Sequence, residues 1–145
     1  MSARVRKLAR GALTAADYAR LSEFRYVLRH FLIFSENAAL AANISAQQHQ
    51  ALLAIKGAGD SVPVTAGLLA ERLGIRHHSA VGLLDRLGEK SLVRRRRNSA
   101  DRRQVLILLT PKAERLLARL SAAHQRELQR VAPLLRGLLA QLARR

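Results

Sequence analysis

Apolar residues recur at every third or fourth position along most of the chain, which is the period of a helix with one buried face. The first helix is expected from Thr14 to about Ala42, because "TAAD" offers a hydroxyl N-cap with an acid three residues later. Its apolar face comprises Leu21, Phe24, Leu28 and Phe31. All five aromatic residues of the chain fall within this helix.

Three shorter helices are expected next. "SAQQ" repeats the capping pattern at Ser45, and that helix ends at Gly57. Thr65 caps the following helix, and Gly74 ends it where a left-handed residue is favoured. A third helix is expected over about residues 78–90, with a regular apolar stripe.

The pattern then changes from helix to strand. Leu92–Arg96 and Gln104–Leu109 flank "RNSADRR", whose Asn, Ser and Asp residues favour a turn, so a β-hairpin is predicted. Val62–Val64 is a candidate for a further short strand. After the hairpin, "TPK" at Thr110 is a typical start of a long helix. Pro133 is expected to break or kink that helix, leaving residues 134–142 as a final one.

The expected fold is mainly α with a small β-wing, in the order helix, helix, short strand, helix, helix, strand, wing, strand, helix, helix. A length of 145 residues suits one domain, residues 1–145. Residues 45–110 form its compact lobe. The long helical regions, 14–42 and 111–145, are expected to bury their apolar stripes in a homodimer, although an intramolecular bundle is the alternative.

Charge narrows the choice of partner. The formal net charge of +16 favours a polyanion, either nucleic acid or an anionic membrane face. Ten Lys or Arg and three Asp or Glu lie between Arg72 and Arg103, so the excess of positive charge is partly concentrated there.

The absence of cysteine excludes disulfides, zinc–thiolate sites and thiol chemistry. No apolar run approaches the ~20 residues of a membrane span, and "MSARVRKLARG" lacks a signal-peptide core, so a cytoplasmic protein is expected.

The segment Leu68–Leu87 has the spacing of a helix-turn-helix. Ala70 is small where two helices would cross, Gly74 lies at the turn, and Ala80 is small where the second helix packs back. Such a pair can place its second helix in the major groove of DNA. Because a basic hairpin follows directly, the combination predicts a winged helix.

The arginines of the hairpin are expected at its exposed surface. Apolar residues would hold the hairpin to the core while Arg95, Arg97, Arg102 and Arg103 meet phosphates or enter a minor groove, where Arg is favoured. Arg94 and Arg96 either do the same or lie on a solvated strand face.

These motifs resemble the MarR family of bacterial transcriptional regulators. "LAERLGI", "LLDRL", "LVRR", "DRR" and "LTPKA" stand where that family has them, and the likeness runs from Ile44 to about Leu120. The resemblance implies a homodimeric winged helix-turn-helix that binds a pseudo-palindromic operator, usually as a repressor, and is released by a small molecule, often an aromatic acid. It also implies that Arg103 enters the minor groove and that the Asp101 carboxylate orients it.

One departure from the family concerns the helix that would read the bases. Val81 and Gly82 stand where the family often has polar or long side chains, so base contacts would depend on the start of the helix and on the long arm of Arg86. The DNA-binding candidates are Thr65, His77, His78, Ser79, Arg86, Arg95, Arg97, Asp101, Arg102 and Arg103. Alternatively, the two histidines only cap the helix and contact phosphate. Asp85 is expected to pair locally with Arg86, Lys90 or a wing arginine.

The aromatic residues of the first helix raise the question of an effector. A small aromatic ligand is one hypothesis, bound by Phe24, Tyr26, His30, Phe31 and Phe34, with Arg25, Arg29 or His30 holding a carboxylate. Ordinary core and dimer packing is the alternative.

Other classes of function find less support in the sequence. No cofactor or metal site is expected, because the five histidines show no i, i+4 pair, although His30 or His49 with His124 could form a metal-responsive site across a dimer. No nucleophile motif or phosphate loop suggests an enzyme. A non-specific architectural DNA-binding protein is the main rival, whereas RNA binding is disfavoured because the aromatics lie away from the basic wing.

Overall fold

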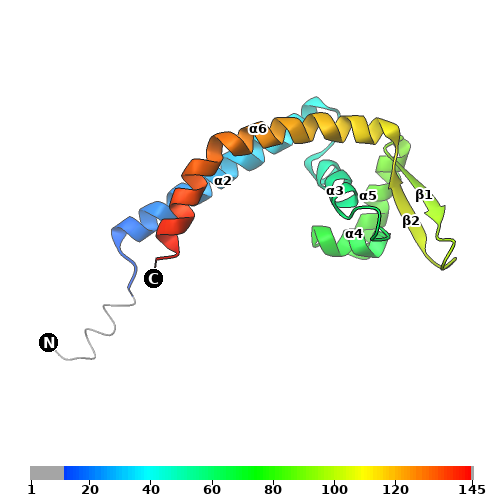
Figure 1. The fold of residues 1–145 in the computed structure, drawn as a ribbon, viewed down its shortest axis with the longest axis horizontal. Helices are drawn as coiled ribbons and strands as arrows, with labels where there is room; N and C mark the ends of the chain where they lie inside the picture. The colour runs from blue at the N-terminus through cyan, green and yellow to red at the C-terminus, as the bar shows by residue number, and fades with distance from the viewer. Residues whose placement is uncertain (1–11, 145) are drawn as a thin grey trace. The chain divides into compact units, whose positions relative to one another are not determined.

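The computed structural model describes residues 12–144, so the basic start of the chain, residues 1–11, and Arg145 lie outside the described part. The described residues form five helices and a two-stranded sheet. In chain order these are α2 (Ala15–Ala41), α3 (Ala46–Gly57), α4 (Ala66–Leu73), α5 (His77–Glu89), β1 (Val93–Arg97), β2 (Val105–Leu109) and α6 (Pro111–Leu142) (Figure 1). The expected class, mainly helical with a small β-wing, is confirmed.

The described residues divide into two compact units: residues 35–124, and residues 12–34 with 125–144. In the first unit α3, α4 and α5 pack with the hairpin around one core (Figure 1). The largest fully buried side chains are leucines, because their branched shape fills the space between short helices without any polar atom. They are Leu52, Leu69, Leu83, Leu84, Leu87 and Leu92.

The helix starts predicted from capping motifs are confirmed. The Ser45 hydroxyl accepts from the Gln48 amide at 3.0 Å, and the Gln48 side chain accepts from the Ser45 amide at 3.0 Å. This reciprocal box satisfies two amides that the first turn of α3 leaves free. The Thr110 hydroxyl caps α6 by accepting from the Ala113 amide at 3.2 Å, and it also donates to the Ser91 carbonyl at 2.7 Å.

The predicted hairpin is present, with strand ends within a residue of those expected. Its antiparallel register pairs Val93 with Leu109 and Arg95 with Ile107. The short strand expected at Val62–Val64 is wrong as a strand, because no ladder forms there. A single hydrogen bond from the Ile107 amide to the Val64 carbonyl, 2.8 Å long, holds this segment against β2. Pro63 has no amide hydrogen to extend the pairing.

The second unit contains a small apolar cluster. Val27 of α2 lies with Val131 and Leu138 of α6, and Phe24 packs against them. The expected break at Pro133 is wrong, since α6 continues through it to Leu142. A proline removes one hydrogen bond from a helix but leaves the flanking turns intact, and here the apolar stripe on both sides keeps them packed.

Within residues 12–144, no helix has the length and apolarity that crossing a bilayer requires.

Candidate nucleic-acid interface

The helix-turn-helix has the geometry that its sequence predicts. Thr65 caps α4 by accepting from the Leu68 amide at 3.2 Å. Gly74 ends α4 with φ +63° and ψ +35°, the left-handed conformation that glycine adopts most easily. Ala70 and Ala80 are both buried, with 6% and 0% of their surfaces exposed. The absence of larger side chains at these two positions allows α4 and α5 to approach closely.

The start of α5 is open to solvent. His77 and His78 are exposed and occupy its first turn, while Ser79 is half-buried. The N-cap is Arg76, which makes no side-chain cap hydrogen bond, so neither histidine is the capping residue. The alternative that the histidines serve as the cap is therefore wrong. Because both histidines are exposed at the N-terminal end of the helix, a polyanion can approach them there.

Arg86 lies one turn beyond Gly82 on an exposed part of α5. Its guanidinium extends over the glycine, because a Cβ added at Gly82 would lie 3.5 Å from Arg86 Nη1. The glycine thus leaves room for the arginine to lie along the helix surface. This explains in steric terms how a small residue in the middle of α5 can be accompanied by a long cationic arm.

The wing is tied to α5 by one ion pair. Arg95 Nη2 of β1 lies 2.7 Å from Asp85 Oδ1 of α5. Asp85 therefore pairs with a wing arginine, one of the partners expected from the sequence. Because Arg95 shares a strand face with buried Ile107, this contact lies on the side of the hairpin that faces the helices.

Hydrogen bonds close the tip of the wing. Arg97 Nη1 donates to the Arg102 carbonyl at 2.9 Å, and the Asn98 amide donates to the Gln104 carbonyl at 3.0 Å. The Asn98 side chain also accepts from the Ala100 amide at 3.0 Å. These bonds fix the turn, so the arginines of the tip project from a defined backbone and not from a loose loop.

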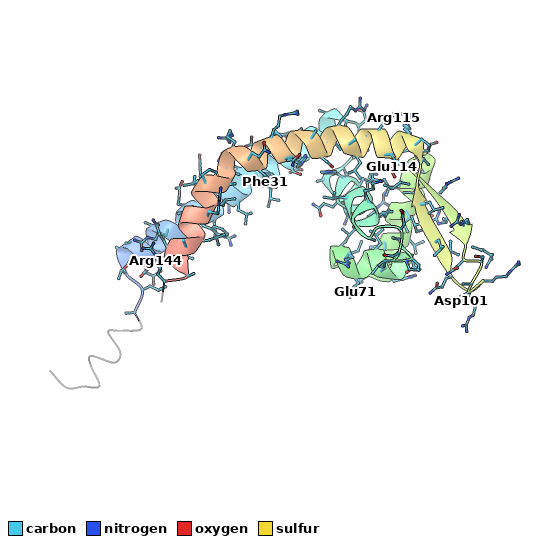
Figure 2. The ribbon with its side chains drawn as sticks, in the orientation of Figure 1. Phe31, Glu71, Asp101, Glu114, Arg115 and Arg144 are labelled. Atoms are coloured by element: carbon cyan, nitrogen blue, oxygen red, sulfur yellow. The ribbon has the colours of Figure 1, made fainter. Side chains whose placement is uncertain are left out.

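Asp101 and Arg103 form an ion pair at this tip, where Figure 2 labels Asp101. Asp101 Oδ1 accepts from both the backbone amide and Nε of Arg103, each at 3.1 Å. The Arg103 side chain is nevertheless 92% exposed. Arg103 Nη2 also donates to Asp101 Oδ2 at 3.5 Å, so the carboxylate holds one edge of the guanidinium while the side chain as a whole stays open to solvent.

A cleft of about 580 Å³ lies between the start of α4, α5 and the wing. We call it the front cleft. It brings together four of the ten DNA-binding candidates, Thr65, His77, Arg95 and Arg103. Of the other six, three lie on α5 and three at the wing tip: His78, Ser79, Arg86, Arg97, Asp101 and Arg102. Gly67 and Gln104 also line the cleft. Neither residue was among the candidates predicted from the sequence, although Gln104 follows the "DRR" motif directly.

Arg94 and Arg96 lie on the opposite face of the hairpin. Their strand partners are Leu108 and Leu106, whereas Arg95 pairs with Ile107. Both arginines line a second hollow of about 530 Å³, the rear hollow, together with Lys56 and Glu114. The Lys56–Glu114 ion pair, 2.9 Å long, spans from α3 to α6 there and raises the pKa of the Lys56 ammonium.

The aromatic candidates for an effector all lie on α2. Phe24 packs in the small apolar cluster, and Phe31 and Phe34 are half-buried. Tyr26 is 58% exposed and its ring lies against His30, with centroids 4.2 Å apart. None of the five lines the front cleft or the rear hollow.

The described residues contain no cluster of three or more His, Asp or Glu that could hold a metal ion.

Comparison with known proteins finds similarity to one protein family over part of the chain. The MarR family model matches residues 42–104, which span α3 to the wing. No curated protein matches the chain. Among solved structures, a MarR family protein from Bacillus stearothermophilus shares 25% identity with a TM-score of 0.70, over 83% of this chain and 82% of that one.

Two further structures have the same fold. A mutant of Staphylococcus aureus MepR bound to an oligodeoxyribonucleotide has a TM-score of 0.67 at 20% identity, over 84% of each chain. CouR from Rhodococcus jostii bound to p-coumaroyl-CoA has a TM-score of 0.64 at 23% identity, over 83% of this chain and 88% of that one. At these identities the likeness concerns the fold.

Proposed function

We propose that the chain is a sequence-specific DNA-binding transcriptional regulator, on the premise that its residues 42–104 match the model of the MarR family. It binds a pseudo-palindromic operator as a homodimer and acts as a repressor in the cytoplasm. Residues 45–110 form the DNA-binding lobe, and residues 14–42 and 111–145 form the dimer. This activity is binding, and no catalytic residue is assigned.

The front cleft is the observation that carries the proposal. It sets the exposed start of α5 beside an arginine held at its base by a carboxylate. With α5 in the major groove, His77, His78 and Ser79 can meet base edges, and Arg86 can reach a phosphate or guanine. Arg103 then extends toward the neighbouring minor groove, whose negative potential favours arginine. Thr65 and the first amides of α4 suit a phosphate between the two.

Exposed apolar side chains support the dimer. In residues 12–34 and 125–144 many large apolar residues are 40% exposed or more, a surface that water disfavours in a monomer. They are Leu13, Tyr18, Leu21, Tyr26, Leu28, Leu32, Ile33, Leu128, Leu134 and Leu139. Two copies joined through these surfaces would present two recognition helices to a two-fold symmetric site.

The effector is proposed to be a small aromatic acid. CouR was solved with p-coumaroyl-CoA, an aromatic acyl thioester, which supports this class of ligand for the fold. Phe24, Tyr26, His30, Phe31 and Phe34 are the proposed contacts. Such a ligand would favour a dimer in which the distance between the two recognition helices no longer matches the spacing of successive major grooves. The dimer would then dissociate from DNA.

The test is the affinity of the purified protein for DNA from upstream of its own gene, against scrambled DNA of equal length, across a salt series. We expect a preference of ~10³-fold or more at physiological salt. Arg103→Ala should weaken specific binding by about ten-fold or more, because one minor-groove arginine is lost. His78→Ala should also weaken it.

Arg119→Ala is the matched control, because it removes the same charge from an exposed site on α6 outside the front cleft. It should reduce affinity for both DNAs alike and only slightly. Equal affinity of the wild type for the two DNAs, with one steep salt slope, would contradict a specific regulator. That result would favour an architectural DNA-binding protein.

A further inference from the structure

Two histidines that are distant in sequence meet inside the larger unit. His49 of α3 and His124 of α6 have ring centroids 4.8 Å apart, with the rings inclined by 50°. His49 is only 4% exposed, and His124 is half-buried. The DNA-binding surface described above uses neither residue.

Hydrogen bonds define which ring nitrogen of neutral His124 carries the hydrogen. Its Nδ1 lies 2.6 Å from the Leu120 carbonyl, which can only accept, so Nδ1 carries the hydrogen. Its Nε2 lies 2.7 Å from the Ser35 hydroxyl of α2 and, in the neutral ring, accepts from it. A second proton on His124 would make Nε2 a donor. The Ser35 hydroxyl would then have to rotate and accept that hydrogen bond instead of donating.

The surroundings disfavour a proton on His49. Burial lowers the pKa of His49 below its ordinary value of 6.5, and the neighbouring His124 lowers that pKa further. The groups that the described residues place at this pair are neutral: the Ser35 hydroxyl of α2 and the Leu120 carbonyl of α6 bind the His124 ring, and Gln48 precedes His49 on α3. No carboxylate acts on His49 to offset a positive charge.

We propose that the His49–His124 pair is a proton-sensitive joint that ties α3 to α6 when both rings are neutral and loosens that packing when the pair takes up a proton. The helices concerned share one core, in which Leu52 of α3 lies with Leu117 and Leu120 of α6. A proton on His49 places a cation in this core next to a second titratable ring. Because α3 also packs against α4, the loosening extends to the helix-turn-helix.

The sign follows from linkage. The folded state binds the His49 proton less tightly than the unfolded chain does, so the unfolded chain holds more protons as pH falls below about 6.5. The stabilisation from neutral His49 is therefore fully present above that pH and is lost on acidification. The described exposed histidines, His30, His77 and His78, have no such buried partner ring.

The direct test is a pH titration of the histidine rings of the wild-type protein by NMR. We expect one ring, assigned to His49, to titrate below 6.5, and His124→Gln to move that titration upward toward the ordinary value. A wild-type His49 that titrates at or above 6.5 would overturn the proposal. This measurement uses no DNA and, for its main outcome, no variant.

The second test is the unfolding temperature between pH 7.5 and 5.5 for the wild type, His49→Gln and His30→Gln. His30 is an exposed histidine on α2, so its variant should keep the wild-type pH dependence. His49→Gln should lose at least about 2 °C less than the wild type over this range, because the amide that replaces the ring does not take up a proton. Equal losses in all three proteins would contradict the joint.

The consequence for DNA binding rests on the proposed function. If the chain binds its upstream DNA, the wild type should lose about twofold or more affinity between pH 7.5 and 6.0 relative to His49→Gln. Protonation of His77 and His78 is common to both proteins and cancels in this ratio. If DNA binding itself fails, the NMR and unfolding experiments still decide whether the joint exists.

Discussion

At the scale of single residues, the ion pair between Asp101 and Arg103 combines restraint with exposure. A long arginine loses rotamer entropy when it enters a groove, and a carboxylate that already holds its Nε reduces that loss. The pair itself adds little to folding, because exposed ion pairs contribute about 0–1 kcal/mol. Its effect should therefore appear in DNA binding and not in stability.

Asp101→Ala is expected to weaken specific DNA binding by about two- to five-fold, corresponding to the ~0.5–1 kcal/mol of an exposed pair. The direction is diagnostic, because removing a negative charge from a DNA-binding surface would by itself strengthen binding. Fluorescence anisotropy with labelled upstream DNA measures the change, and urea unfolding should show no loss of stability.

Asp60→Ala is the matched control for this change, since Asp60 is an exposed acid beside the rear hollow. It should leave DNA affinity unchanged or slightly raised. If Asp101→Ala behaved in the same way, the carboxylate would have no role in positioning Arg103.

At the scale of elements, the turn between α4 and α5 shows how much a local signal can determine. Thr65, Gly74 and Ala80 could be assigned from the sequence because caps and left-handed turns depend on a few neighbouring residues. The break at Pro133 and the strand at Val62–Val64 were wrongly predicted for the opposite reason. Whether a proline ends a helix, or an apolar triplet joins a sheet, depends on packing against distant parts of the chain.

Gly74→Ala is expected to destabilise the protein by about 1–2 kcal/mol, because a Cβ is strained at φ +63° although open space surrounds it. Gly88→Ala is the matched comparison: this glycine lies inside α5, also with nothing near its Cβ position, and alanine there should stabilise by up to about 1 kcal/mol. Urea unfolding of both variants tests the pair. Similar effects of the two substitutions would show that backbone conformation does not control this turn.

At the scale of the whole molecule, the sequence could not show which residues that are distant along the chain lie close together in space. The candidates of the front cleft were named from local patterns in the sequence and, for the role of Arg103, from the family resemblance. That Thr65, His77, Arg95 and Arg103 line one cleft follows only from the tertiary structure. The meeting of His49 with His124 is another case. The sequence suggested that the two could meet across a dimer to hold a metal, whereas a single chain brings their rings together.

The proposed dimer gives a prediction at this scale. Leu128→Gln combined with Leu139→Gln should shift the protein from dimer toward monomer, because both leucines are exposed on α6 in the unit that contains the C-terminus, at 43% and 51%. Sedimentation velocity over a concentration series measures the shift. Leu53→Gln changes a leucine on α3 that is 48% exposed, and it should leave the protein in the same oligomeric state as the wild type. A wild type that sediments as a monomer at micromolar concentration would contradict the dimer.

The alternation of the wing arginines has a consequence for how the protein can change over evolutionary time. Arg95 faces α5, whereas Arg94 and Arg96 share the other face with Leu106 and Leu108. Because adjacent residues of a strand point to opposite sides, a mutation at 94 or 96 alters one surface of the wing without touching the other. The rear surface can therefore accumulate substitutions, and acquire new contacts, while selection on DNA recognition continues to act on the front alone.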